Sequence, residues 1–381
     1  MKRRLNLKIY GESPRSLLLA FILSKLKCDI YIYEFLESSN SKKDYQTFLF
    51  SNSSKTLFSK FDIWNEIEEI SYGFTSLSIK DNMVSEKILL RNDNSSINNL
   101  NIIGWTANYY DIRRLLINKL IENQNVHFIS NKQLIDESLI FDYEFNFNNY
   151  DKILKLFKSP LKSNNRIDDR ILIFNVYLRG NVEKRLYEIN TSKGLLVLIP
   201  LSKNLYQIIW NYSSLGTKEN PITSKSFFLD NLTTLLPGEL KVDQIIDSIN
   251  YLSVNNIFST YLIKNKSIYF NENKFKSNTI YDFNFDVIIK YVLKIYNFLE
   301  KNKSSNIMYY NKFGFYYLLR KYVEIIINFS FFNFLFYLFK VNNLYSLFLR
   351  KILFTLFKKI NLIRIFVKKN LNIYNINNLL K

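Results

Sequence analysis

The chain has 381 residues, a formal net charge of +19 and 48% hydrophobic residues, and 17% of its residues are aromatic. A chain of this length buries a large core and predicts two domains, while this hydrophobic content excludes general disorder. The strong positive charge indicates an anionic partner, either nucleic acid or a lipid surface. The low glycine count, eight in the chain, is also typical of an AT-rich genome, so composition alone identifies no partner.

The chain contains one cysteine, Cys28, and one histidine, His127. These counts exclude a disulfide framework, a cysteine metal cluster and a multi-histidine metal site, so we expect no metal. They favour a reducing compartment such as the cytoplasm. The stretch "NVHFIS" around His127 predicts a short buried strand, and we expect a structural rather than a catalytic histidine there.

The first elements along the chain predict a parallel βαβ unit. Residues 5–11, "LNLKIYG", are typical of a buried strand that ends at a glycine. Residues 13–26 place apolar side chains on a helical face, and Pro14 suits the first turn of that helix. Residues 28–34, "CDIYIYE", are β-branched and aromatic, as in a second strand. Strand, helix and strand in this order form a right-handed crossover.

The remaining chain alternates between helical and strand patterns. Helices are expected at residues 53–70, 109–124, 224–236, 242–250 and 285–302, and beyond residue 311. Strands are expected at residues 74–81, around His127, at 170–180, 184–190, 194–202 and 205–214, and, as a lone strand, at 266–272. The block from 170 to 212 has short strands between polar turns, which predicts an antiparallel sheet. The fold class is therefore α/β, a parallel-sheet domain interleaved with a mainly antiparallel one.

The turn after the first strand has the spacing of a dinucleotide-binding motif. Gly11, Ser13 and Ser16 occupy the three positions that are glycines in G-x-G-x-x-G, and only the first is a glycine here. Glu34 ends the second strand, where an acid can accept hydrogen bonds from ribose hydroxyls. An ordinary βαβ unit with a surface glutamate would look the same, so the motif alone leaves both interpretations open.

Several segments, in order along the chain, resemble the FAD-dependent aromatic-ring hydroxylases of ubiquinone biosynthesis. They are "DYQTFLFSNSSKTLFSKFDIWNEI", "IGWTANYYDIRRLLINKL", "KRLYEINTSKGLLVLIPLSKNLYQIIWNYSS" and the basic tail "LFLRKILFTLFKKINLIRIFVKKNL". The resemblance implies a Rossmann-like FAD/NAD(P)-binding domain, FAD as cofactor, and a polyprenylated aromatic ring as substrate. It also implies partner enzymes of the quinone pathway. On this reading, the FAD-type domain comprises 1–70, 100–150 and 255–320, the β-sheet substrate domain 71–99 and 151–254, and the tail 321–381.

The departures from this family fall where the flavin would bind. Gln46 stands in place of an arginine, and Glu272 follows Asn271 in place of a Gly-Asp turn. No glycine occurs between Gly238 and Gly314, although backbone approaches a flat ring closely only where side chains are absent. We therefore expect flavin binding and hydroxylation to be weakened or lost, with catalytic residues unassigned. The alternative is a non-catalytic scaffold or prenyl-lipid-binding protein of the same pathway.

The end of the chain predicts a helix that lies on an anionic membrane surface. From Ile325 onward there are nine Lys or Arg and no acid. On a helix over 350–371, one apolar stripe is formed by Ile352, Leu353, Leu356, Ile360, Ile363, Val367 and Leu371. The rest of the circumference carries Arg350, Lys351, Lys358, Lys359, Arg364, Lys368 and Lys369. This pattern favours a peripheral protein on the cytoplasmic, inner face of a membrane over a nucleic-acid-binding one. Packing of the stripe on the protein's own core is the alternative.

Overall fold

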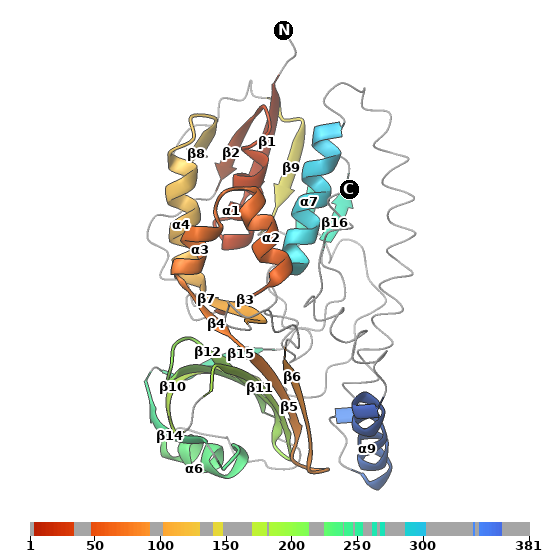
Figure 1. Cartoon of the computed structure of the whole chain (residues 1–381). Helices are drawn as coiled ribbons and strands as arrows, with labels where there is room; N and C mark the ends of the chain where they lie inside the picture. Colours follow the sequence, from red (N-terminus) through yellow and green to blue (C-terminus); the bar gives the residue numbers. More distant parts are fainter. Residues whose placement is uncertain are drawn as a thin grey trace, which may run out of the picture.

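The computed structural model describes residues 4–33, 47–91, 102–129, 140–147, 170–180, 183–212, 225–238, 240–246, 248–253, 261–264, 267–270, 286–301, 338–339 and 343–359. Within them the strands form three sheets (Figure 1). A mainly parallel sheet lies at one end of the molecule, a larger mixed sheet lies at the other, and a small antiparallel sheet lies between them.

The first sheet has the order β16-β17-β9-β1-β2-β8. Its strands are β1 (Leu5–Tyr10), β2 (Cys28–Tyr33), β8 (Val126–Ile129), β9 (Tyr143–Asn146), β16 (Tyr261–Lys264) and β17 (Ser267–Phe270). All neighbours are parallel except β16 and β17. The predicted parallel pairing of the first two strands is confirmed, from Leu5 opposite Cys28 to Tyr10 opposite Tyr33. The strand expected to be alone, β17, instead pairs with both β16 and β9.

Helices cover one face of this sheet (Figure 1). The covering helices are α1 (Pro14–Leu23), α4 (Tyr109–Ile121) and α7 (Asp286–Lys301), while α2 (Asn52–Lys60) and α3 (Trp64–Glu69) lie beside them, next to the small sheet. Helix α1 packs against both α4 and α7, so nine of its ten residues are buried rather than one face alone. The single helix predicted at 53–70 is wrong: α2 ends before Phe61, and Asp62 takes a positive φ of 56° that starts a new direction.

The mixed sheet has the order β14-β10-β13-β12-β11-β5-β6, and β15 also pairs with β10. Its strands are β5 (Ser76–Asp81), β6 (Glu86–Arg91), β10 (Arg170–Gly180), β11 (Arg185–Thr191), β12 (Gly194–Pro200), β13 (Leu205–Tyr212), β14 (Leu240–Ile245) and β15 (Asn250–Ser253). The antiparallel pairing expected between residues 170 and 212 is present, and a parallel pairing of β11 with β5 extends the sheet. Helix α6 (Lys225–Leu235) covers one face.

The helix predicted at 242–250 is wrong, because β14 and β15 occupy this stretch. Val242, Ile245 and Ile249 recur at helical spacing, but β10 presents an unpaired edge beside them. Pairing along that edge satisfies backbone groups on both strands, and this tertiary gain outweighs the local helical pattern.

The small sheet, β3 (Thr47–Ser51), β7 (Gly104–Asn108) and β4 (Ser71–Phe74), connects the two larger sheets. Leu49 and Phe74 from it join a core cluster with the mixed sheet, and Thr106 on β7 donates a hydrogen bond to the carbonyl of Pro200 on β12. Helix α9 (Leu344–Lys359) packs beside β6 and contributes Phe354 and Phe357 to the same cluster (Figure 1).

Candidate functional site

The turn between β1 and α1 sits at the carboxyl ends of the central parallel strands. Gly11 has a φ of 118°, which favours glycine, and its N–H donates to the carbonyl of Tyr33 at the end of β2 (3.2 Å). Ser13 is the N-cap of α1 and accepts from the N–H of Ser16 (3.3 Å), while Pro14 takes the first helical position. In open α/β sheets this edge is where ligands bind.

Ser16 stands where the dinucleotide motif has its third glycine, and the structure shows how a hydroxyl fits there. The side chain is fully buried, and the single proton of its Oγ is shared between the carbonyls of Gly11 (3.0 Å) and Ser13 (2.8 Å). The hydroxyl therefore fixes the turn internally instead of leaving room for closer helix–strand packing. The turn is kept tight by different chemistry from that of the glycine motif.

An ion pair closes the turn from the side of α4, and sequence reasoning missed it. Arg113 donates from Nη2 to Glu12 Oε2 (2.9 Å) and from Nε to the Glu12 carbonyl (3.2 Å). Both side chains are mostly buried. Glu12 lies in the turn, and Arg113 lies in a helix that begins about a hundred residues later. No local sequence pattern therefore indicated that the two side chains pair. The carboxylate of Glu12 adds negative charge beside the positive end of α1, where an anionic phosphate would bind.

The other predicted cofactor contacts cannot be placed. Glu34, Gln46 and Glu272 all lie outside the described residues. The structure thus brings Gly11, Ser13 and Ser16 together at one turn, and the roles assigned to all six residues stay predictions. The expected buried position of His127 is wrong: it lies on the exposed side of β8, stacked on Tyr31 at 4.9 Å.

The inner face of the mixed sheet, opposite α6, carries a second group of polar side chains. Strand alternation turns Tyr187 and Ile189 toward α6 and turns Glu188 and Asn190 inward, toward the small sheet. Glu188 lies in one cross-strand row with Val197, which in turn lies opposite Ile209.

Two more amides lie on this inner face. Gln207 donates to the side-chain oxygen of Asn175 (3.3 Å). Asn211 has a buried Oδ1 that accepts no hydrogen bond within the part of the chain that the structure describes. Buried polar oxygens without donors are rare in folded proteins, and they are candidates for contacts with a ligand.

Glu188 is the titratable group of this face. It keeps some accessible surface, yet burial raises the pKa of its carboxyl to about 7. Such a carboxyl can hold or accept a proton at neutral pH, as general acid–base groups do. The sequence signal was a charged residue at an inward position of the alternating strand "RLYEINT", and spacing alone did not distinguish it from a surface glutamate.

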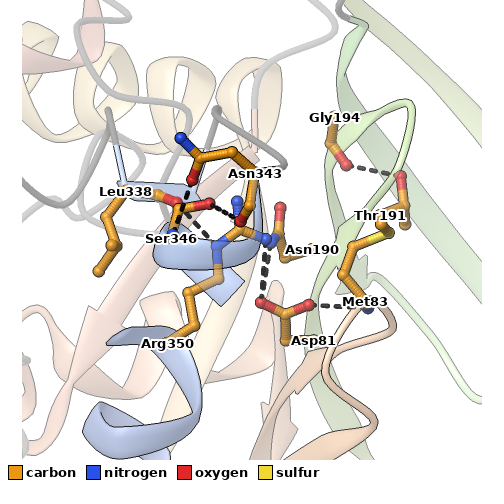
Figure 2. Close-up of polar contacts among 9 residues, drawn as sticks. All are labelled: Asp81, Met83, Asn190, Thr191, Gly194, Leu338, Asn343, Ser346 and Arg350. Atoms are coloured by element: carbon orange, nitrogen blue, oxygen red, sulfur yellow. Dashed lines mark hydrogen bonds and ion pairs between the residues drawn. The ribbon is translucent and has the colours of Figure 1, made fainter. Parts of the chain in front are cut away.

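At the edge of the same face, a buried charge pair holds α9 against the sheet (Figure 2). Arg350 and Asp81 are both fully buried, with 3.4 Å between Nη1 and Oδ2. Asp81 also accepts from Asn190 Nδ2 (3.0 Å) and from the N–H of Met83 (2.8 Å). Arg350 Nε donates to the carbonyl of Leu338 (2.7 Å). Burial lowers the pKa of Arg350, and the attraction of Asp81 opposes that shift.

This pair corrects the prediction that Arg350 lies on an exposed cationic surface. Arg350 belongs to the buried face of α9 with Ser346, Phe354 and Phe357. Lys351, Lys358 and Lys359 are exposed, as expected. Residues beyond Lys359, including the rest of the predicted stripe and its basic residues, lie outside the described part of the chain. None of the helices in the described parts is long and apolar enough to cross a bilayer.

Comparison with known proteins identifies the fold and nothing finer. No protein-family model and no curated protein sequence matches the chain. Among solved structures, it is similar to p-nitrophenol 4-monooxygenase PnpA from Pseudomonas putida, with a TM-score of 0.64 and 11% identity over 98% of this chain and 99% of that one.

Two further structures, each with a TM-score of 0.52 and 12% identity, agree. One is PqsL, a probable FAD-dependent monooxygenase from Pseudomonas aeruginosa, matched over 70% of this chain and 78% of that one. The other is a flavin-dependent halogenase from Xanthomonas campestris, matched over 75% and 70%. The chain has the fold of FAD-dependent monooxygenases, as the sequence predicted.

Proposed function

We propose that this protein is a divergent flavoprotein of the aromatic-ring hydroxylase type that acts in ubiquinone biosynthesis, at a membrane surface, with a weakened hold on FAD. The observation that carries the proposal is the β1–α1 turn. Gly11, at φ 118°, and the Ser13 cap form a tight turn of the kind that dinucleotide sites use, in a chain similar to a monooxygenase over 98% of its length.

The residues of the turn fit the pyrophosphate end of FAD. Gly11 makes the tight turn that directs the chain into α1, and the amino end of α1 favours an anion. Arg113 supplies a cation at the same turn, and the predicted contact of Glu34 would hold the ribose. When bound, the flavin supplies the oxygen chemistry, and the protein's part is to bind and orient it.

Two features of the turn would lower the affinity for FAD. The guanidinium of Arg113 is already paired with the carboxylate of Glu12, so a pyrophosphate must compete with Glu12 for Arg113. The negative charge of Glu12 also repels the pyrophosphate. The hydroxyl of Ser16 is fixed in the space that a glycine would leave. The absence of glycine from 239 to 313 in the sequence adds a third cause on the flavin-ring side.

The inner face of the mixed sheet supports an aromatic ring with a hydroxyl group as the substrate. Glu188 can take a proton from a phenol, because burial raises its pKa to about 7. The Oδ1 of Asn211 can accept a hydrogen bond from a ring hydroxyl. The apolar residues around them, Val197 and Ile209, suit the ring itself. That the ring carries a prenyl chain is implied by the family resemblance alone.

The test is the visible absorption spectrum of the purified protein, followed by titration with FAD. We expect a colourless protein that binds added FAD reversibly and loses it on dialysis. Stoichiometric yellow flavin after dialysis would show that the hold on FAD is not weakened. A protein that quenches no flavin fluorescence at any FAD concentration would reject the flavoprotein proposal.

The second candidate is a non-catalytic prenyl-lipid-binding protein or scaffold of the same pathway. The internally bonded Ser16 favours it, because the turn is complete without a ligand. Extraction of the purified protein with organic solvent and mass spectrometry of the extract distinguishes the two. A bound prenylated ring in a protein that does not take up FAD would support this candidate.

A further inference from the structure

Helix α9 has two different faces. The inner face is buried against the mixed sheet and carries Ser346, Arg350, Phe354 and Phe357. The outer face carries large apolar side chains that are exposed to solvent. They are Leu344 (87% exposed), Tyr345 (72%), Phe348 (62%), Ile352 (37%) and Leu356 (38%). With 3.6 residues per turn, Tyr345, Phe348, Ile352 and Leu356 fall on one line along the helix, and Leu344 lies beside it at the amino end. We call these five residues the outward apolar stripe.

Such a concentration of exposed apolar surface is unusual. Ten large hydrophobic residues are exposed in the described parts of the chain, and five of them are on this one helix. The others, such as Ile121 and Tyr177, lie on separate elements. Single exposed apolar residues are normal, whereas a contiguous row of them marks an interaction site.

The charges that helix α9 itself carries beside the stripe are of one sign. Lys359 continues the line of the stripe, and Lys351 and Lys358 lie on its flank; all three are exposed. Lys358 pairs with Glu86 of β6, while the helix itself contains no acid, and neither does the sequence from Ile325 onward. An apolar row with a cationic border matches an anionic bilayer surface, which attracts lysines and accepts apolar side chains beneath its headgroups.

The buried charge pair makes this surface rigid. The ion pair of Arg350 with Asp81 and its hydrogen bond to Leu338 fix the rotation of α9 about its axis (Figure 2). Because this pair faces inward, the stripe must face outward. The surface is therefore present before any partner arrives, so no folding on the membrane is required.

We propose that the outward apolar stripe, with Lys351 and Lys359, is the surface on which the protein docks on an anionic phospholipid bilayer. This surface shares Ile352 and Leu356 with the apolar stripe that the sequence predicted, extends it back to Leu344, and removes Arg350 from its cationic border. The inference stands on exposure and charge, so it holds whether or not FAD is bound.

The test is flotation of the full chain, without added flavin, with phosphatidylcholine vesicles that do or do not contain phosphatidylglycerol. We expect binding to the anionic vesicles only, and weaker binding at high salt. Replacement of both Phe348 and Ile352 by Gln removes apolar contact and should lower the affinity by about tenfold or more. Replacement of both Lys351 and Lys359 by Gln should lower it roughly fivefold per charge.

Ile121→Gln and Tyr177→Gln are the matched controls, since each removes an exposed apolar side chain from another element. Both should float like the unmodified protein. Because all these side chains are exposed, the thermal unfolding temperature of every variant should be unchanged.

Three results would overturn the proposal. One is equal flotation with neutral and anionic vesicles, and another is an undiminished affinity of the Phe348 and Ile352 variant. The third is a chain that does not float but self-associates through the stripe, with the double variant monomeric by size exclusion. That third result would assign the stripe to a second copy of the chain. None of these results bears on the binding of FAD, which the absorption spectrum tests separately.

Discussion

At the β1–α1 turn, the ion pair of Glu12 with Arg113 sets the charge that a bound phosphate would meet. Their ion pair is mostly buried, so screening by water is limited and the carboxylate acts strongly on a neighbouring anion. A dinucleotide brings two phosphate charges to this turn and meets one carboxylate already there. The same pair also ties α4 to the turn, which gives it a structural role apart from binding.

Glu12→Gln should therefore tighten the binding of ADP, which carries the adenine end of FAD alone. Loss of one like charge near the phosphates is worth about 1 kcal/mol, or roughly fivefold in affinity. Arg113→Gln should weaken binding by a similar factor or more, because a charge-assisted contact is lost. Calorimetric titration measures both, with Glu122→Gln at the end of α4 as the control for charge alone. Weaker binding by the Glu12 variant would mean that the ion pair shapes the site rather than blocking it.

Glu188 should make stability depend on pH. Burial raises the pKa of its carboxyl from an ordinary 4.5 to about 7 in the folded chain. The folded state therefore binds the proton more tightly, and its stabilising effect is complete below about pH 4.5 and lost as the pH rises through about 7. The full effect is about 3 kcal/mol. Urea unfolding of wild type and Glu188→Gln should show that the variant gains relative stability between these limits. Parallel curves for the two proteins would contradict a buried carboxyl.

Strand β7 lies between β3 and β4, and its first residue, Gly104, has no space for a larger side chain. A Cβ on Gly104 would stand 2.6 Å from the ring of Phe74 and 2.9 Å from the carbonyl oxygen of Phe50. Both neighbours belong to the paired strands, so a backbone shift would disturb the small sheet that joins the two larger ones.

Gly104→Ala should destabilise the protein by about 1–3 kcal/mol, the usual cost of overpacking. Gly238→Ala is the control, because among the described residues, chain neighbours aside, no heavy atom lies within 4 Å of the added methyl group. Thermal unfolding of both variants measures the difference. Equal stability of the two variants would show that Phe74 can turn away without cost.

The elements that were predicted correctly are those whose stabilising interactions are local in the sequence. The βαβ unit was predictable because Pro14, the Ser13 cap and the apolar strands on either side all act within a few residues. The strand at Leu240–Ile245 was not, because its partner β10 is some sixty residues away in the chain. The parallel pairing of β11 with β5 is non-local in the same way. At the site, Gly11, Ser13 and Ser16 were found from spacing, while Arg113 needed the fold to reach Glu12.

Helix α9 depends on the pair of Asp81 with Arg350, and sequence periodicity placed Arg350 on the wrong face of the helix. Asp81→Asn leaves a fully buried guanidinium without its counterion, and it should cost about 3–5 kcal/mol in urea unfolding. Lys358→Gln on the same helix breaks only the ion pair with Glu86. Because the Lys358 side chain is 46% exposed, this change should cost less than about 1 kcal/mol. The double variant Asp81→Leu with Arg350→Met should recover part of the loss, because an apolar pair needs no desolvation. Equal costs for Asp81→Asn and Lys358→Gln would remove the pair as the anchor of α9.

At the scale of the whole molecule, one core cluster joins the small sheet, the mixed sheet and helix α9. It contains Leu49 of the small sheet, Val197 and Ile209 of the mixed sheet, and Phe354 of α9. The cluster lies on the inner face that carries Glu188. The β1–α1 turn packs on a second cluster, which includes Leu17 of α1 and Phe50 of β3, so the small sheet contributes to both clusters. Ligand binding at either place should therefore stabilise the whole fold.

This continuity allows thermal unfolding to show which end of the dinucleotide site is retained. A ligand that binds only the folded chain raises its stability by RT ln(1 + [L]/Kd), which is about 2.7 kcal/mol at a hundredfold excess over Kd. If the adenine end carries the remaining affinity, FAD and ADP at equal concentration should raise the unfolding temperature by the same amount. An intact flavin-ring side would make the rise with FAD clearly larger, because only FAD has a ring to bind there. Riboflavin, which lacks the adenine end, is the control and should produce no rise. A large rise with riboflavin would place the surviving affinity at the ring and overturn the weakening that we infer from the glycine-free stretch between Gly238 and Gly314.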